Sequence, residues 1–430
     1  MGKTYCGSCR GERGCKGCDA VGTSVVYTGL TEFFAERMMP GAFGGNVTAY
    51  SECKESLQSR ELLLAADLGT TTLAFVCAAG CGRVLASYGC ENPQRKTAAD
   101  VIGRIDAALH GHAELLEKEI KEALVRGFLF VLHRGEEVLR KEHADAEASI
   151  IRIAIAGNTT MQHLLMGYPV DGLAKAPFVP YKTEKEECKF WKLFGKTDGY
   201  DKIPEMLRQA EVTVFPCMSA FVGGDVVAGA NVVFSDGVNE TDRTELLIDL
   251  GTNGELLLWA QGNLYGTAAA MGSAFEGGRY AYASDLFRKI ATAAEQGVMD
   301  ETGLLCEPYF TEGFDGLLQE DVREFQLAKG AIRAGIELLC RYAKVSTGQI
   351  YRIFLAGGFG QFCKEEDLVL TGLLPAEFAG KITVVGNGCI GGLLSYLKNR
   401  ESVIYCKGEV LNLAKQPEFE ALYYRYMNFE

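Results

Sequence analysis

Two short turns in the sequence carry residue types suited to binding a polyphosphate. Each reads Asp-Leu-Gly-Thr, at 67–70 and again at 249–252, and each ends a run of apolar residues typical of a buried strand. A glycine lets the backbone approach a ligand closely, while backbone N–H groups and threonine hydroxyls form a nest for phosphate oxygens. The aspartates, Asp67 and Asp249, are placed to hold Mg²⁺ through water. One such turn can be a plain hairpin, but two turns from related halves predict a clamp for a triphosphate.

Each turn is followed by a second matching segment, which indicates an internal repeat. Ile-Ala-Gly-Asn at 155–158 matches Leu-Ala-Gly-Gly at 355–358, in the same order relative to the turns. The later copy continues as Ala-Gly-Gly-Phe-Gly at 356–360, between a predicted strand and a predicted helix. Paired glycines there let a flat ring or a phosphate lie against the helix N-terminus, although packing alone also explains them. The sequence contains neither a Walker P-loop nor a Rossmann glycine motif after its first strand.

Four cysteines near the N-terminus form a candidate metal centre: Cys6, Cys9, Cys15 and Cys18. Their spacing lets two Cys-x-x-Cys knuckles close on one centre, and the intervening glycines free the backbone to donate N–H bonds to the sulfurs. Four thiolates suit either tetrahedral zinc or an iron–sulfur cluster, and the spacing alone does not choose between them.

The elements that must position these groups divide the chain into four parts. Residues 1–22 contain the cysteines and almost nothing apolar, so this segment orders around a metal or stays disordered. Residues 23–60 have the composition of a connector. From residue 61 onward buried strands alternate with helical periodicity, which predicts an α/β fold. The repeat divides that region into a first ATP-binding half, 61–240, and a second half, 241–430.

Composition and charge exclude several classes of function. The chain has 430 residues, 48% hydrophobic and 23% charged, as expected for a globular protein of two or three domains. Its net charge of −13, with no long run of Lys and Arg, argues against nucleic acid as a partner. No apolar run is long enough for a membrane span, and the N-terminus lacks the apolar core of a signal peptide, which predicts a cytoplasmic protein. Fifteen cysteines fit the reducing interior of an anaerobic cell.

These turns and their repeat resemble the superfamily of acetate and sugar kinases, heat-shock chaperones and actin. The resemblance implies a duplicated ribonuclease H-like fold that binds ATP and Mg²⁺ in a cleft. In that superfamily both turns bind phosphate and the late glycine segment contacts adenosine. Carried over residue by residue, it implies a first phosphate site at Asp67, Gly69, Thr70 and Thr71, with Asn158 in the matching segment, a second at Asp249, Gly251, Thr252 and Asn253, and an adenosine site at Gly357, Gly358 and Phe359.

A longer series of motifs makes the resemblance more specific. In order along the chain these are NPQ at 92–94, ADVIGRI at 99–105, IAGNTTMQHLL at 155–165, APFVP at 176–180, GGDVVAG at 223–229, DLGTNGE at 249–255, AFEGG at 274–278, AGGFG at 356–360 and VGN at 385–387. Together they resemble the ATP-dependent reductive activators of corrinoid proteins. That family uses ATP to drive an uphill electron transfer, which returns an inactive cob(II)amide to cob(I)amide on a partner protein. The resemblance implies a corrinoid protein or related metalloprotein as partner, an external electron donor and a homodimer.

Within that family the four cysteines favour an iron–sulfur cluster over zinc, with 4Fe–4S ahead of 2Fe–2S. The sequence departs from the better-known form, which has a whole ferredoxin-like domain and a linker domain before the ATP-binding region.

Asp225, in GGDVVAG, is a further catalytic candidate. It follows an apolar strand and could orient the attacking water or Mg²⁺, although an aspartate that caps a helix is an equal alternative. Three other functions remain open at this point. They are an electron-donating ATPase for another metalloenzyme such as a dehydratase, a small-molecule kinase of the same fold, and a non-redox binding module that carries zinc.

Overall fold

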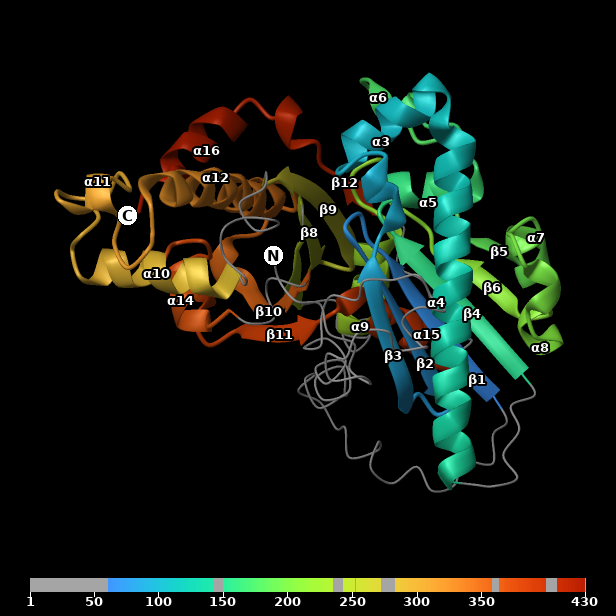
Figure 1. Cartoon of the computed structure of the whole chain (residues 1–430). Coiled ribbons are helices and arrows are strands. Elements are labelled where there is room, and N and C mark those ends of the chain that lie inside the picture. Colours follow the sequence, from blue (N-terminus) through green and yellow to red (C-terminus); the bar gives the residue numbers. More distant parts are fainter. Residues whose placement is uncertain are drawn as a thin grey trace. The chain divides into compact units, whose positions relative to one another are not determined.

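The computed structural model describes residues 61–142, 150–234, 243–251, 253–271, 283–357, 363–399 and 408–429. These form two compact units, whose elements are labelled in Figure 1. Unit 1 comprises the described residues up to Val232 together with those of Cys389–Cys406, and unit 2 comprises the described residues of Val233–Gly388 and Lys407–Glu430. The predicted cysteine segment, 1–22, and the connector, 23–60, lie outside the described residues.

Unit 1 is built on a six-stranded sheet in the order β3-β2-β1-β4-β6-β5. The first three strands form an antiparallel meander, and β4 and β6 then extend the sheet in parallel from β1. The short strand β5 closes the far edge and runs antiparallel to β6. The strands are β1 (Glu61–Leu68), β2 (Thr72–Ala79), β3 (Val84–Glu91), β4 (Ile150–Gly157), β5 (Glu186–Lys189) and β6 (Glu211–Val214).

Helices cover both faces of this sheet. The long helix α4 (Ala113–Glu142) packs across β2 and β3 (Figure 1), because its apolar residues recur at every fourth position from Leu116 to Phe128. The other face packs against α9 (Gly224–Val233) and α15 (Gly388–Lys398). The remaining helices are η3 (Pro93–Lys96), α3 (Val101–Ala107), η4 (Ala108–His112), α5 (Thr159–Met166), α6 (Asp171–Ala174), α7 (Phe190–Phe194), η5 (Tyr200–Lys202) and α8 (Glu205–Arg208).

Unit 2 contains a second six-stranded sheet, in the order β11-β10-β7-β8-β9-β12. Strands β7, β8 and β9 form an antiparallel meander, and β10 and β11 extend the sheet in parallel from β7. The strands are β7 (Thr244–Leu250), β8 (Asn253–Ala260), β9 (Asn263–Ala270), β10 (Ile350–Ala356), β11 (Ile382–Gly386) and β12 (Glu409–Val410).

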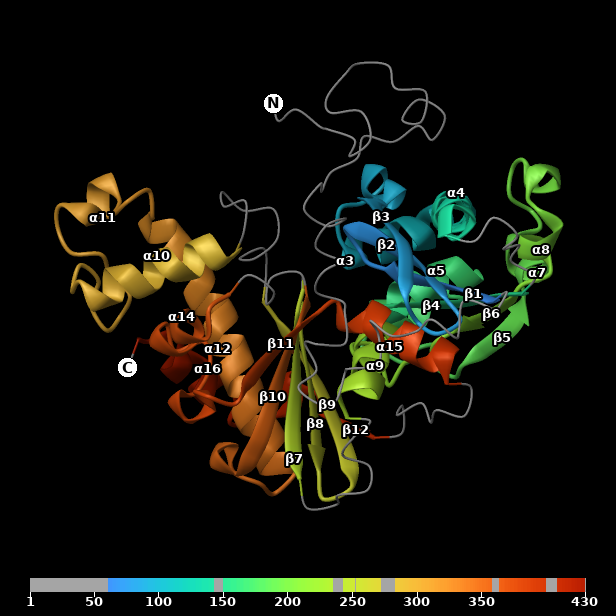
Figure 2. The same cartoon turned by 90° about the horizontal axis from the view of Figure 1, so that it is seen from below.

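One large apolar core holds unit 2 together. Helix α12 (Gln319–Tyr342) packs against β8 and β9 and against the C-terminal helix α16 (Phe419–Met427), as Figure 2 shows from below. The remaining helices are α10 (Ala283–Glu295), α11 (Tyr309–Glu312), η7 (Thr347–Gln349), α14 (Glu365–Leu370), η8 (Ala376–Phe378) and η9 (Leu413–Lys415). Among the described residues, no helix combines the length and the apolar character that crossing a membrane requires.

The two units repeat one topology, as the duplicated fold predicts. Strands β1, β2, β3, β4 and β6 of unit 1 correspond in order and direction to β7, β8, β9, β10 and β11 of unit 2. Even the side chains that join the central parallel strands match. Arg152 on β4 pairs with Glu61 on β1 at 2.6 Å, and Arg352, at the same place on β10, pairs with Glu245 on β7 at 2.7 Å.

Helix α15 belongs to unit 1 although it lies late in the chain. It follows β11 within the predicted second half, 241–430. Its residue Gly392 lies so close to α9 that a Cβ atom there would be 1.7 Å from the Ala228 carbonyl oxygen. Backbone contact of this kind explains why a glycine occupies the position.

Candidate functional site

The first predicted turn lies at the end of β1, between two antiparallel strands, as the sequence indicated. Asp67 and Leu68 pair with Ala74 and Leu73 of β2, and residues 69–71 form the turn between the strands. A Cβ atom on Gly69 would lie 2.4 Å from the Thr72 carbonyl oxygen, so only glycine fits this bend.

Asn158 connects this turn with the next parallel strand. It follows β4 and caps α5, where its Oδ1 accepts a hydrogen bond from the Met161 N–H at 3.0 Å. Its Nδ2 donates to the Thr70 hydroxyl oxygen at 2.9 Å. The structure therefore brings together two residues that the sequence placed in the cofactor site, Thr70 and Asn158.

The glycine before Asn158 makes this approach possible. Gly157 pairs with Leu68 across the parallel ladder, and a Cβ atom on Gly157 would lie 2.5 Å from the Leu68 carbonyl oxygen. Strand β4 can therefore end directly beside the start of the turn only because this residue has no side chain.

Asp225 lies in the first turn of α9, and its Oδ1 accepts a hydrogen bond from the Val226 N–H at 2.9 Å. Burial raises the pKa of the Asp225 carboxyl to about 7, and the negative charge of Asp67 adds to the rise. A Cβ atom on Gly223 would be 2.5 Å from Asn158 Cα and 2.7 Å from Asp225 Oδ1, so the start of α9 lies beside the Asn158 cap. Unit 1 therefore collects Asp67, Thr70, Asn158 and Asp225 in one place.

The negative charge of Asp67 makes ionisation of Asp225 less favourable, and a divalent cation bound between them would offset this repulsion. Magnesium commonly binds through one or two carboxylates, water and substrate phosphates, which matches the pair Asp67 and Asp225. No group of three or more His, Cys, Asp or Glu side chains suited to a metal occurs among the described residues, so this part of the chain offers no all-protein metal cage.

Three polar residues that we did not assign a role from the sequence hold the back of this turn: Asn92, Gln94 and Arg104, all fully buried. Asn92 Nδ2 donates to the Gly69 carbonyl oxygen at 2.9 Å, and Arg104 Nη2 donates to the Thr70 carbonyl oxygen at 2.6 Å. Gln94 Nε2 donates to the Leu116 carbonyl oxygen at 2.8 Å, which ties the group to α4. These residues lie in the NPQ and ADVIGRI segments. Their position within the ordered series of motifs is the sequence feature that could have identified them.

The second predicted turn lies at the equivalent end of β7 in unit 2. The Gly251 N–H donates to the Asn253 carbonyl oxygen at 3.0 Å, which closes the turn. Asp249 lies opposite Glu255 in the antiparallel ladder, so both acidic side chains leave the same face of the sheet. Thr252 lies outside the described residues.

Gly357 occupies in unit 2 the position that Gly157 occupies in unit 1. Its φ is 90°, and a Cβ atom there would lie 2.3 Å from the Leu250 carbonyl oxygen and 2.6 Å from Asp249 Oδ1. The conformation and the close approach both require glycine. The other predicted adenosine contacts, Gly358 and Phe359, lie outside the described residues.

The two turns also match in register. Asp67 pairs with Ala156 across β1 and β4, and Asp249 pairs with Ala356 across β7 and β10. In both units the aspartate therefore stands beside an Ala-Gly strand end, which is the arrangement that the sequence repeat indicated.

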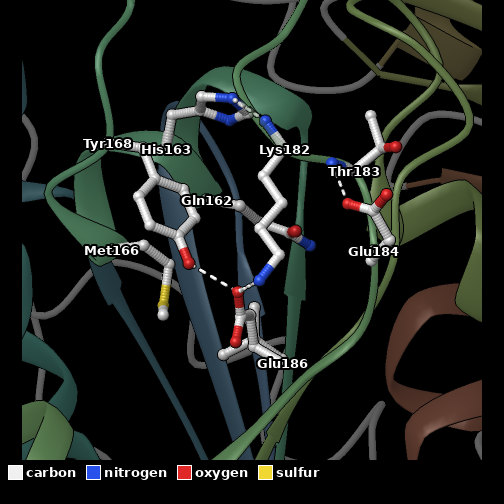
Figure 3. Close-up of a pocket in the computed structure, with 9 residues that line it drawn as sticks. Gln162, His163, Met166, Tyr168, Lys182, Thr183, Glu184 and Glu186 are labelled. Carbon is white, nitrogen blue, oxygen red and sulfur yellow. Dashed lines mark hydrogen bonds and ion pairs between the residues drawn. The ribbon is translucent and has the colours of Figure 1, made fainter.

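A small pocket of unit 1 lies apart from these residues. Figure 3 shows Tyr168 and Lys182 converging on Glu186, with a hydrogen bond of 2.5 Å from the Tyr168 hydroxyl. His163 forms one wall of the pocket. Its Nε2 accepts from the Tyr181 N–H at 3.1 Å and its Nδ1 donates to the Thr159 carbonyl oxygen at 2.7 Å, so the ring is a neutral packing element. None of the predicted site residues lines the pocket.

The buried cysteines of the described chain are packing residues. Burial raises the pKa of the Cys217 and Cys340 thiols to about 12, which keeps them protonated and unreactive. The four predicted metal ligands, Cys6, Cys9, Cys15 and Cys18, lie outside the described residues.

Comparison with known protein families gives two matches that together cover most of the chain. A model described as the RACo middle region matches residues 62–235. A second, described as the C-terminal domain of RACo, the ASKHA domain, matches residues 243–284 and 316–430. The second match and the topology of both sheets confirm the predicted duplicated α/β fold.

Individual relatives agree with these matches. The corrinoid activation enzyme RamQ of Eubacterium limosum is 26% identical, over 84% of this chain and 69% of RamQ. Among solved structures, a reductive activator for corrinoid, iron-sulfur protein has a TM-score of 0.70 and 25% identity, over 86% of this chain and 66% of that chain. The chain thus spans slightly less than two thirds of that structure. An activator of 2-hydroxyisocaproyl-CoA dehydratase from Clostridium difficile matches over 78% of this chain and 94% of its own, at 11% identity and a TM-score of 0.35.

Proposed function

Because the chain belongs to the RACo family, the reductive activators of corrinoid proteins, we propose that it couples ATP to the reduction of a corrinoid protein. In this reaction a low-potential electron returns inactive cob(II)amide to cob(I)amide on the partner protein. The observation that carries the proposal is the matched pair of turns, with Asp67 and Asp249 in the same register beside an Ala-Gly strand end.

The turns supply the proposed contacts to ATP. In unit 1 the Gly69–Thr71 backbone and the Thr70 hydroxyl would bind phosphate, and Asn158 orients that hydroxyl. In unit 2 Asp249, Gly251, Thr252 and Asn253 would bind phosphate, and Gly357, Gly358 and Phe359 would contact adenosine.

Asp67 and Asp225 are the residues that would hold Mg²⁺, which when bound neutralises phosphate charge. If Asp225 does not contact Mg²⁺ directly, its carboxylate would instead orient the attacking water. The proposed catalytic residues are therefore Asp67, Asp225 and Asp249.

The four N-terminal cysteines are the proposed ligands of an iron–sulfur cluster, with 4Fe–4S favoured, and zinc is the alternative. Four thiolates fit either centre, but electron transfer requires a redox-active one. Metal analysis and the visible absorption of anaerobically purified protein distinguish them. A colourless protein with stoichiometric zinc would contradict the cluster.

The energy required is modest. For a one-electron couple roughly 59 mV corresponds to a tenfold change in an equilibrium constant, or about 1.4 kcal/mol. A nucleotide-dependent preference of a few kcal/mol would therefore move an electron transfer by more than about 100 mV. ATP binding is thus sufficient in principle to make an uphill reduction of cobalt proceed.

The decisive experiment mixes the purified chain, a chemical reductant and a corrinoid protein under anaerobic conditions, with and without ATP. Cobalt absorption spectra report the cob(I)amide formed. We expect cob(I)amide to form only when ATP is present. We also expect the protein to release phosphate from ATP without any added sugar or acid. Equal cob(I)amide yields with and without ATP would contradict the proposal, and phosphate transfer to a small molecule would identify a kinase instead. Size-exclusion chromatography with light scattering tests the proposed homodimer.

A further inference from the structure

The back of the first turn is more strongly constrained than a hairpin requires. Its three successive carbonyl oxygens, of Gly69, Thr70 and Thr71, accept hydrogen bonds from Asn92 Nδ2, Arg104 Nη2 and the Asn92 N–H, at 2.9, 2.6 and 2.8 Å. In a trans peptide the N–H points away from the carbonyl of the same peptide plane. The amide N–H groups that follow these carbonyls are therefore directed away from Asn92 and Arg104.

Arg104 is unusual because its charge is buried without an ion pair to any residue that the structure describes. Its side chain is fully buried, and every hydrogen bond it makes goes to a neutral acceptor. Nε donates to the Ala98 carbonyl oxygen, Nη1 to Gln94 Oε1 and to Met161 Sδ, and Nη2 to the Thr70 carbonyl oxygen.

Arg104 stays charged in this environment. Burial lowers the pKa of its guanidinium to about 10, which still leaves it protonated at neutral pH. Asp100 and Glu119 favour the charged form through space, and Arg95 opposes it. No carboxylate of the described residues forms a salt bridge with Arg104. Burying a cation without a paired anion costs free energy, which a bound anion can offset.

We propose that Arg104 is a positioning residue for the ATP phosphates, which supply the negative charge that this buried cation lacks. It fixes the Thr70 carbonyl and thereby polarises the Thr70–Thr71 peptide, so that the Thr71 N–H becomes a stronger donor to phosphate. Its charge also lies directly behind the turn. The inference rests on the proposed nucleotide function and adds to it a residue that acts through the turn without touching ATP.

Because the proposed effect depends on charge, loss of Arg104 should weaken the binding of ATP, which has negatively charged phosphates, but not the binding of adenosine, which has none. Calorimetric titration of the full-length protein with each ligand measures both affinities without turnover. We expect Arg104→Met to weaken ATP binding by about tenfold to a hundredfold, as for loss of a hydrogen bond from a charged group, and to leave adenosine binding unchanged. Arg104→Lys retains the charge but not the planar fork, so it should restore part of the ATP affinity.

Arg152→Met is the matched control. Arg152 is also buried in unit 1, but it pairs with Glu61 on the neighbouring strand and makes no contact with the turn. We expect this variant to lose stability while the folded protein keeps its affinity for ATP.

Two outcomes would overturn the inference. They are unchanged ATP affinity in folded Arg104→Met and an equal loss of ATP and adenosine affinity. If Arg104→Met does not fold, as judged by circular dichroism, Arg104→Lys and Asn92→Asp decide the question. Asn92→Asp keeps the acceptor for the Gln94 N–H but loses the donor to Gly69. It should weaken ATP binding, and unchanged affinity in both variants would refute the inference. A wild-type protein that does not bind ATP would instead refute the proposed function.

Discussion

Asn158 Nδ2 donates a hydrogen bond to the Thr70 hydroxyl oxygen, 88 residues earlier in the chain. A hydroxyl has one proton to donate, and because the Thr70 oxygen accepts from the amide, that proton is directed to another acceptor. In the proposed nucleotide complex that acceptor is a phosphate oxygen.

The first prediction follows from this bond. Asn158→Asp keeps the acceptor that caps α5 at the Met161 N–H but replaces the donor to Thr70 with a carboxylate. The Thr70 hydroxyl would then donate to the carboxylate, and the added negative charge would repel phosphate. We expect ATP binding at least about fivefold weaker, with thermal stability close to wild type, measured by titration calorimetry and calorimetric unfolding. Wild-type affinity in this variant would show that the hydroxyl does not bind phosphate.

The second prediction concerns pH. The folded-state pKa of Asp225 is raised from 3.8 to about 7, so between these values the folded protein binds more protons than the unfolded chain. The contribution of Asp225 to stability therefore falls as pH rises through this window, by at most about 1.4 kcal/mol per pH unit, and is constant above it.

Asp225→Asn removes that dependence. Relative to wild type, the variant should gain stability as pH rises from about 4 to about 7, measured by denaturant titration at several pH values. Mg²⁺ with ATP should reduce the difference, because a bound cation favours the ionised carboxylate. A difference between the two proteins that does not vary with pH would contradict the raised pKa.

The third prediction tests the second turn. Asp249→Ala should abolish ATP turnover, because it removes the carboxylate at the end of β7 that stands beside the Ala356–Gly357 strand end. Phosphate release under saturating ATP is the measurement. Glu245→Gln, on the same strand but in the Arg352 pair, is a suitable control that should retain turnover in the folded fraction. Retained activity in Asp249→Ala would show that the second phosphate site is placed incorrectly.

The fourth prediction tests the close approach of β1 and β4. In Gly157→Ala the new methyl group would meet the Leu68 carbonyl oxygen at 2.5 Å, so the strand end or the turn must move. We expect a stability loss of roughly 1–3 kcal/mol and weakened ATP binding. Gly348→Ala is the control, since its nearest neighbour would be Ser346 Oγ at 3.9 Å and no movement is needed. Equal behaviour of the two variants would contradict the steric account.

The ends of the central strands could be predicted from the sequence because the residues that mark them are neighbours in the chain. Asp67, Gly69 and Gly157 each follow an apolar run. The bends and close contacts at Gly69 and Gly157 require glycine, so these positions can be recognised in the sequence. The repeat extended the same logic to Asp249 and Gly357. Local patterns of this kind therefore predicted the two sheets and the residues at their strand ends.

Residues that act over long separations could not be found in this way. Arg104 is 34 residues from the carbonyl it holds, and its sequence neighbours resemble those of an ordinary helical arginine. Nothing local indicates that it is buried, because arginine is seldom buried without a partner. The grouping of α15 with unit 1 likewise depends on apolar contacts with strands that lie far earlier in the chain.

That grouping has a consequence for biosynthesis. A ribosome makes unit 1 up to Val232 early, but α15, which covers one face of its sheet with Ile390 and Leu393, emerges only after most of unit 2 has been made. Unit 1 is therefore begun first, but it cannot be completed until most of unit 2 has been made. Until α15 has been made, part of that apolar face is uncovered, so we expect a chain truncated before Gly388 to aggregate during synthesis.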